Sequence, residues 1–332
     1  MDICDRRALK EEACDALRQA PCDHKKLILI HTGIAAAVML AVTLVNTFLD
    51  YRIADLGGLS GLGSRTLLST VQSVLVTVSS MVLPFWEMGY LFAVLRLARR
   101  QQASVGTLLD GFRNFGPVLR FYLIKYLLLS AIAFACYYPS VLIFMVTPMG
   151  RAWLLELAQA GSGGMMDWMP DEAALEAASE AMLPLLVIFL ALYLLLAIPV
   201  LYRLRMAEFA LAENPGAGAF RAIRASVKMT KRNCMKLFRL DLSFWWYFAL
   251  EGLLAALCYG DVVLPALGIR LPFSGTGVFL ICYALGLVGQ TALYWWRRNE
   301  VMTTYAVTYE YLKDAQEPSA PATPPKKQPW NY

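Results

Sequence analysis

Residues Glu213 to Asp241 read ENPGAGAFRAIRASVKMTKRNCMKLFRLD and lie between two long apolar segments. The less polar side chains of this stretch recur at steps of three and four, which places them on one side of a helix. They are Phe220, Ile223, Val227, Thr230, Cys234 and Leu237. The remaining surface carries the cations Arg221, Arg224, Lys228, Lys231, Arg232, Lys236 and Arg239. The pattern predicts a basic amphipathic helix that lies on a membrane surface.

The segments on either side of this stretch predict an integral membrane protein. The 332 residues are 58% hydrophobic and only 17% charged. A helix needs about 20 apolar residues to cross a hydrocarbon core about 30 Å thick. Six segments meet this requirement, namely 27–49, 67–95, 118–145, 182–202, 242–258 and 277–296. We therefore expect an all-α bundle of six membrane-spanning helices, in which 242–258 is the weakest candidate because it is short and contains Glu251.

This pattern predicts that the chain is divided into three parts. Residues 1–26 form a charged N-terminal arm with a short helix, and residues 27–313 form the six-span membrane domain. Residues 314–332 are rich in proline, which predicts a disordered tail.

The distribution of basic residues predicts the orientation in the membrane. The net charge is +5, and most of the 30 Lys and Arg residues gather in the N-terminal arm, the second-to-third connection, the fourth-to-fifth connection and the C-terminal segment. Because loops rich in Lys and Arg stay in the cytoplasm, both termini are expected there. Clustering by loop explains the positive charge, so no nucleic-acid partner is expected.

A second, shorter surface helix is expected before the third span. Val105, Leu108, Leu109, Phe112 and Phe115 again follow helical steps. The run SVGTLLDGFRN aligns with GAGAFRAIRAS when Gly106 is set against Gly218. This indicates an internal repeat of span, surface helix and span. Convergence on the same hydropathy is the alternative explanation.

Four polar residues within the predicted spans are candidates for function, because ionisable groups in hydrocarbon are costly. They are Glu87, Lys125, Glu251 and Gln290. Glu251 follows Asp241 by ten residues, which places it near the bilayer midplane if the helix is continuous. Gly286 and Gly289 give the span of Gln290 a close-packing side. The carboxylates could line a proton or cation path, hold a lipid headgroup or an amine, or serve packing alone, protonated or paired with Lys125.

The ends of the basic stretch are predicted hinges. Asn214 and Pro215 break the preceding helix, because proline disfavours helical geometry in the residue before it. Asp241 is expected to form a salt bridge with Arg239 or Lys236 where the surface helix turns into the fifth span.

No enzyme motif is found, and with only two histidines most hydrolytic mechanisms lack their usual groups. We expect a protein that is not an enzyme and that needs no cofactor or metal ion.

Residues 212–251, AENPGAGAFRAIRASVKMTKRNCMKLFRLDLSFWWYFALE, carry a resemblance to a known family. The turn Glu213-Asn214-Pro215 and the run Leu237 to Phe244 resemble the bacterial integral membrane proteins called domain of unknown function nine-seven-five. That family also shows aromatic residues after the last span, matched here by Tyr305, Tyr309 and Tyr311. The resemblance implies a multi-pass protein of a bacterial cytoplasmic membrane and no assigned activity. The unit of span, surface helix and span is more loosely similar to the membrane domain of some glycerophosphodiester phosphodiesterases.

The expected function is that of a non-enzymatic membrane protein that binds anionic lipid and supports transport or envelope homeostasis. Its lipid contacts would be Arg221, Arg224, Lys228, Lys231, Arg232 and Lys236. The alternatives are a transporter or channel that uses Glu87 and Glu251, and an intramembrane enzyme.

Overall fold

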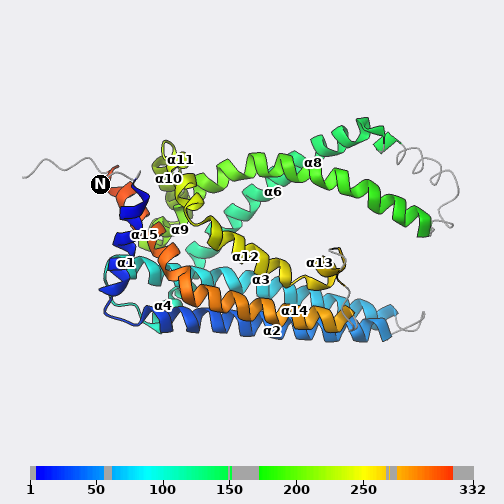
Figure 1. The fold of residues 1–332 in the computed structure, drawn as a ribbon, viewed down its shortest axis with the longest axis horizontal. Helices are drawn as coiled ribbons and strands as arrows, with labels where there is room; N and C mark the ends of the chain where they lie inside the picture. The colour runs from blue at the N-terminus through cyan, green and yellow to red at the C-terminus, as the bar shows by residue number, and fades with distance from the viewer. Residues whose placement is uncertain are drawn as a thin grey trace, which may run out of the picture. The chain divides into compact units, whose positions relative to one another are not determined.

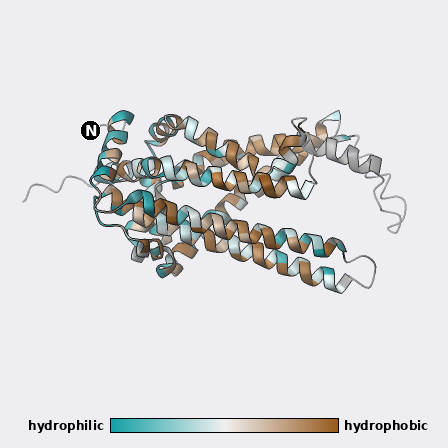
Figure 2. Cartoon of the chain, turned by 60° about the horizontal axis from the view of Figure 1, so that its bottom comes forward, coloured by the Kyte–Doolittle hydropathy of each residue, from teal (hydrophilic) through white to brown (hydrophobic). Residues whose placement is uncertain are grey.

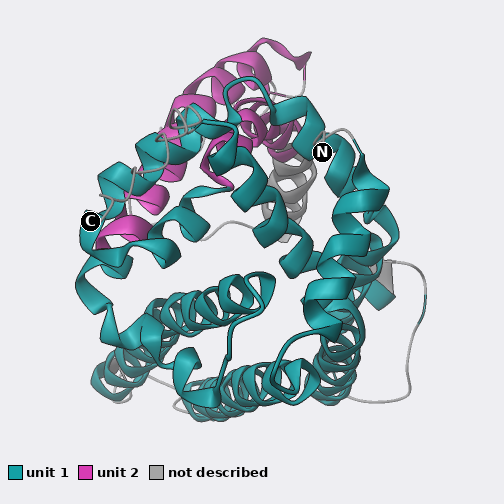
Figure 3. Ribbon diagram, turned by 90° about the vertical axis from the view of Figure 1, so that its left-hand side faces the viewer, with its two compact units in different colours: residues 1–119, 206–332 teal, residues 120–205 magenta. Residues whose placement is uncertain are grey.

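The computed structural model describes residues 5–55, 62–148, 150–151, 172–266, 269 and 275–316. Within these residues the chain forms helices and turns without a β-strand. It divides into two compact units, which Figure 3 colours separately: unit 1 comprises residues 1–119 and 206–332, and unit 2 comprises residues 120–205.

The long helices correspond to the predicted spans (Figure 1). They are α2 (His24–Asp55), α3 (Leu62–Ala98), α6 (Phe115–Val146), α8 (Glu172–Leu204) and α14 (Gly275–Leu293). These five are long and apolar enough to cross a membrane, and there are six if the bent pair α11 (Cys234–Leu242) and α12 (Trp245–Leu257) is one span. Hydrophobic colouring dominates them in Figure 2. The expected all-α, multi-span architecture is confirmed.

The remaining helices are short and belong to unit 1. They are α1 (Arg6–Arg18), α4 (Val105–Leu108), α5 (Asp110–Arg113), α9 (Ala207–Glu213), the 3-10 turn η2 (Pro215–Ala217), α10 (Ala219–Thr230), α13 (Gly260–Ala266), the π-helical turn η3 (Tyr294–Arg298) and α15 (Asn299–Asp314). The turn η3 joins α14 to α15, so the helix continues past the last predicted span.

The two ends of the described chain meet in unit 1, where α1 packs on α15. Leu9 and Ala13 of α1 are buried against Val307, with Tyr311 and Ala98 packed beside them. We call this end of unit 1, formed by α1, α9, α10, α11 and α15, the basic end.

The basic stretch is not one helix, contrary to the prediction. It contains η2, α10, a turn at residues 231–233 and then α11. The turn at the start is confirmed: α9 ends at Glu213, the Asn214 side chain accepts from the backbone of Ala217 at 3.2 Å, and Pro215 begins η2. Gly218 follows with a φ of 83°, a value that glycine adopts without strain.

The face of α10 that packs on the protein is formed mainly by small side chains. Ala219, Ala222, Ser226 and Met229 are buried, whereas Phe220 is 75% exposed. Small side chains allow α10 to approach α9 closely, and a phenylalanine at these positions would hold the two helices apart. Phe220 of the predicted apolar face therefore points away from the protein, whereas Thr230 of the same face is buried.

Two further expectations are corrected. The predicted surface helix at residues 105–115 is two single turns, α4 and α5, with Leu108 fully buried and Val105 half exposed. Arg96 holds these two turns in place, because it donates to Thr107 at 3.0 Å and to Asp110 at 3.1 Å.

The fifth span bends by 69° between α11 and α12, so Glu251 lies only about 9 Å along α12 from Trp245, by the helical rise. The prediction that Glu251 lies near the bilayer midplane assumed one continuous helix from Asp241, and the bend removes that assumption.

Candidate functional site

At the basic end, Glu213 is the centre of a charged network. Its carboxylate accepts hydrogen bonds from Arg99, from the Tyr309 hydroxyl at 2.7 Å and from Lys313 at 2.8 Å. Arg99 also donates to Glu310 at 2.7 Å. Burial lowers the pKa of Arg99, but the hydrogen bonds to the two carboxylates outweigh it, so the pKa lies above its usual value. The network fixes the start of the basic stretch to α3 and α15.

Three tyrosines of α15 each donate a hydrogen bond to a carboxylate on another helix. Tyr305 donates to Asp241 at 2.6 Å, Tyr309 to Glu213, and Tyr311 to Glu12 at 2.5 Å. Asp241 is thus held by a tyrosine of α15, a partner that the sequence does not indicate. These are the three aromatic positions of the family resemblance, and they attach α11, α9 and α1 to one helix.

The exposed surface of α10 and α11 combines cations with large apolar side chains. The cations Arg221, Arg224, Lys228, Lys231 and Arg232 are exposed or half-buried, and Lys236 follows them on α11. The exposed large apolar residues are Phe220, Met235 at 64% exposure, Phe238 and Leu242. Beside α10 lies a hollow of about 300 Å³, lined by Arg221, Lys228 and Lys313 among others.

A second polar cluster lies between α2, α3 and the junction of α14 with α15. Glu87 forms an ion pair with Arg298, and its other oxygen lies 3.7 Å from Nε2 of His31. The His31 ring stacks on Trp86 and Tyr90, with centroid distances of 5.4 and 4.7 Å. The indole of Trp86 donates to the His31 carbonyl at 3.0 Å. The cluster therefore joins three helices through both charge and ring stacking.

The π-helical turn η3 extends this cluster. Tyr294 donates to Glu251 at 2.6 Å, and the Arg298 guanidinium lies over the Tyr294 ring at 4.3 Å. Tyr90 donates to Asn299 at 2.8 Å, and the Asn299 amide donates to the His24 carbonyl at 2.7 Å. A π-turn adds one residue to a helical turn and often occurs at functional positions. Here it lies between Gln290, which faces the cluster, and α15, which holds the basic end.

A cavity of about 150 Å³ brings two of the four predicted intramembrane residues together, because Glu87 and Gln290 both line it. Glu251 is not among the residues that line this cavity, but it accepts a hydrogen bond from the hydroxyl of Tyr294, which does line it. Lys125 belongs to unit 2, where its ammonium lies 5.6 Å from the centre of the Tyr122 ring. Glu87 is paired with Arg298, whereas the sequence offered Lys125 as its partner.

Arg298 is a residue of this site that sequence reasoning missed. The charge pattern alone groups Arg298 with the C-terminal basic residues. Gln290, Tyr294 and Arg298 follow one another at steps of four, a spacing that places Arg298 on the polar side of the last span.

The predicted close packing of the last span is confirmed at Gly286. A Cβ atom there would lie 2.5 Å from the Cys258 sulfur and 3.1 Å from the Leu254 carbonyl oxygen of α12.

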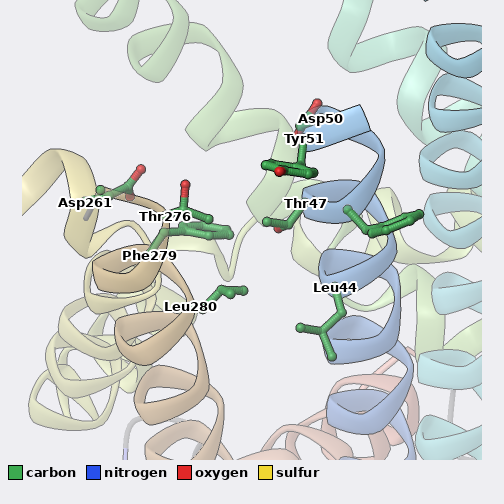
Figure 4. A pocket seen from close by; sticks show the side chains of 10 residues that line it. Leu44, Thr47, Asp50, Tyr51, Asp261, Thr276, Phe279 and Leu280 are labelled. Atoms are coloured by element: carbon green, nitrogen blue, oxygen red, sulfur yellow. The ribbon is translucent and has the colours of Figure 1, made fainter. Parts of the chain in front are cut away.

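A larger cavity of about 810 Å³ lies at the other end of α2 and α14 (Figure 4). Asp50 and Tyr51 of α2 line it on one side, and Asp261 of α13 and Thr276 of α14 on the other. Asp50 accepts a hydrogen bond from Gln72 of α3 at 2.9 Å.

Comparison with protein families matches residues 6–315 to a family described as Protein of unknown function (DUF975). Comparisons with curated proteins and with solved structures give no match. The match covers the basic stretch and the three tyrosines of α15, so it confirms the family resemblance drawn from those residues. It does not support the looser similarity to the membrane domain of glycerophosphodiester phosphodiesterases.

Proposed function

The chain belongs to the DUF975 family of proteins of unknown function, and we propose that it is a non-enzymatic membrane protein that binds anionic lipid through the exposed surface of α10. The observation that carries this proposal is the exposed surface of α10. On this surface Phe220 projects beside Arg221 and Arg224 in a helix whose other face is buried. A helix of this kind inserts its apolar side chain at the boundary between headgroups and acyl chains, and its cations meet the headgroups.

Charge supports the same proposal. Each Lys or Arg near an anionic surface contributes about 1 kcal/mol of binding free energy. The cations at residues 221–232 of α10 and the following turn are therefore enough to select anionic over neutral lipid. The hollow that contains Arg221, Lys228 and Lys313 has room for a phosphate headgroup at about 300 Å³.

The Glu213 network supports a defined position of α10. A flexible basic segment would lose conformational entropy on binding. Here α9 and η2 are already attached to α3 and α15 through Arg99, Tyr309 and Lys313. The cations of α10 are thus held in place before lipid binds, which lowers the entropic cost of binding.

The experiment compares thermal unfolding of the full chain in nanodiscs of neutral lipid with unfolding in nanodiscs that contain phosphatidylglycerol. The unfolding temperature is expected to rise with anionic lipid, and to rise much less for Arg224→Glu/Lys228→Glu. The control is Arg7→Glu/Arg18→Glu, which makes the same change in net charge at exposed positions of α1. Equal lipid dependence of the two double variants would contradict the proposal.

A further inference from the structure

We infer that the cavity between α2, α3 and η3 is a binding site for a small primary ammonium ion. The inference is independent of lipid binding, because the residues that line the cavity lie on α2, α3, α14 and η3, whereas those that would hold lipid lie on α10, the turn after it and α15. It rests on an unpartnered imidazole, on the hydrogen-bonding character of the cavity wall, on charge and on size.

The imidazole of His31 needs a partner that the described part of the chain does not provide. Its side chain is only 2% exposed, and neither ring nitrogen makes a hydrogen bond of normal geometry with a described residue, although the Trp86 backbone lies near the ring. Nε2 lies 3.7 Å from Glu87, too far for a hydrogen bond. A buried polar atom without a partner costs about 1–3 kcal/mol. The ring lines the cavity, so a molecule bound there can supply the missing partner.

The hydroxyl groups of the cavity wall are arranged as acceptors. Thr32 donates its proton to the Ile28 carbonyl, and Thr291 donates to the Leu287 carbonyl, each at 2.8 Å. Tyr294 donates to Glu251. Each hydroxyl proton is thus used within the protein, and the oxygen lone pairs remain for a ligand. An ammonium group has three donors and no acceptor, which fits a wall of this kind.

Charge favours a cation over an anion. The cluster holds two carboxylates and one guanidinium: Glu87 pairs with Arg298, and Glu251 is joined to the cluster through the Tyr294 hydroxyl. Arg298 is already paired through one oxygen of Glu87, and 36% of the Glu87 side chain is exposed. A single positive charge would balance the second carboxylate. An anion would meet two carboxylates and a guanidinium that is already engaged.

The size limits the ligand to a few heavy atoms. About 150 Å³ corresponds to roughly five water molecules at about 30 Å³ each. The remaining wall includes Met39 and Leu287, which suit a short alkyl group. Methylammonium and ethylammonium have the required donors, charge and volume.

In the test, ethylammonium chloride is titrated into the purified full chain and the unfolding temperature is measured. Tetramethylammonium chloride is the control, because this ion has the same charge but no N–H donor. Ethylammonium is expected to raise the unfolding temperature with a saturable dependence, and tetramethylammonium is not. Thr291→Val removes one acceptor while keeping the side-chain shape, and should weaken ethylammonium binding about tenfold.

The matched control is Thr47→Val, which loses the same kind of bond to its own helix, 2.9 Å to Thr43, and lies outside the residues that line this cavity. Glu87→Gln should abolish binding but also breaks the pair with Arg298, so the decision rests on Thr291→Val. The inference is overturned if both ions stabilise equally, if ethylammonium does not bind, or if Thr291→Val binds it as tightly as Thr47→Val.

Discussion

At the scale of single residues, the structure relies on carboxylates that join helices distant in sequence. Glu213 joins α9 to α3 and α15, and Glu87 joins α3 to the last helix and faces His31. Buried or half-buried charges are stable only when paired and hydrogen-bonded. Loss of one partner therefore costs more than the loss of a surface ion pair.

Tyr309→Phe tests this dependence at Glu213. Tyr309 is buried and its hydroxyl donates to a carboxylate, so removal of the hydroxyl should reduce the free energy of unfolding by about 2 kcal/mol. Chemical unfolding in mixed micelles measures the change. Tyr283→Phe, in α14 and outside the network, is the control. A loss for Tyr309→Phe no larger than for Tyr283→Phe would show that the hydrogen bond is not stabilising.

At the scale of elements, glycine sets how closely helices approach. Gly89 of α3 lies against the backbone of α4, where an added Cβ would overlap the Leu108 carbonyl oxygen. Gly111 of α5 makes a second close contact with α3, since a Cβ added there would overlap the Phe85 carbonyl oxygen of α3. The two turns after α3 are therefore folded directly onto that helix.

Gly89→Ala should prevent this packing, because backbone atoms cannot move aside as a flexible side chain can. The expected result is loss of monodisperse protein in size-exclusion chromatography. Gly33→Ala is the matched control, since no atom of the described chain outside its own helical backbone lies within 4 Å of a Cβ at that position of α2. It should leave the yield unchanged or raise stability by up to about 1 kcal/mol through helix propensity. Normal behaviour of Gly89→Ala would contradict the packing described.

Docking of α1 should depend on pH through Lys10. Its ammonium donates to the Ser243 carbonyl at 2.9 Å and lies 3.9 Å from the centre of the Phe244 ring. Burial, with nearby Arg6, holds the pKa of Lys10 below its usual value. The unfolded chain then binds more protons than the folded one between the two pKa values, so the Lys10 contribution becomes more favourable as pH rises through that window.

The measurement is the difference in unfolding free energy between the wild type and Lys10→Met from roughly pH 8 to roughly pH 10.5, near the usual pKa of lysine. The difference should shift in favour of the wild type as pH rises. A constant difference would show that Lys10 has the same pKa in both states.

At the scale of the whole molecule, the sequence was sufficient to predict where the long helices lie. It was not sufficient to predict where helices break or bend. Apolar length located the five long helices, since only such segments can cross a bilayer. The bend between α11 and α12 follows Leu242 without a glycine or proline, so no local signal marks it. Charge counting by loop and the Asn214-Pro215 turn identify the basic end.

The candidate sites were less predictable, because their residues are distant in sequence. Glu87 and Arg298 are 211 positions apart, and only packing of α3 against the last helix brings them together. The face of α10 that packs on the protein was not predicted, because periodicity cannot tell which side of a helix meets the protein and which side meets lipid or solvent. The small residues Ala222 and Ser226 make the closer contact and leave Phe220 outside.

The central claim is that α10 binds anionic lipid, and native mass spectrometry of the full chain tests it most directly. The measurement counts phosphatidylglycerol molecules that stay bound after release from mixed-lipid nanodiscs. At about 1 kcal/mol for each cation removed, loss of two should weaken retention at least roughly 30-fold in Arg224→Glu/Lys228→Glu. The account predicts retained phosphatidylglycerol in the wild type and in Arg7→Glu/Arg18→Glu, and little in the α10 variant. Equal retention in all three proteins would contradict it.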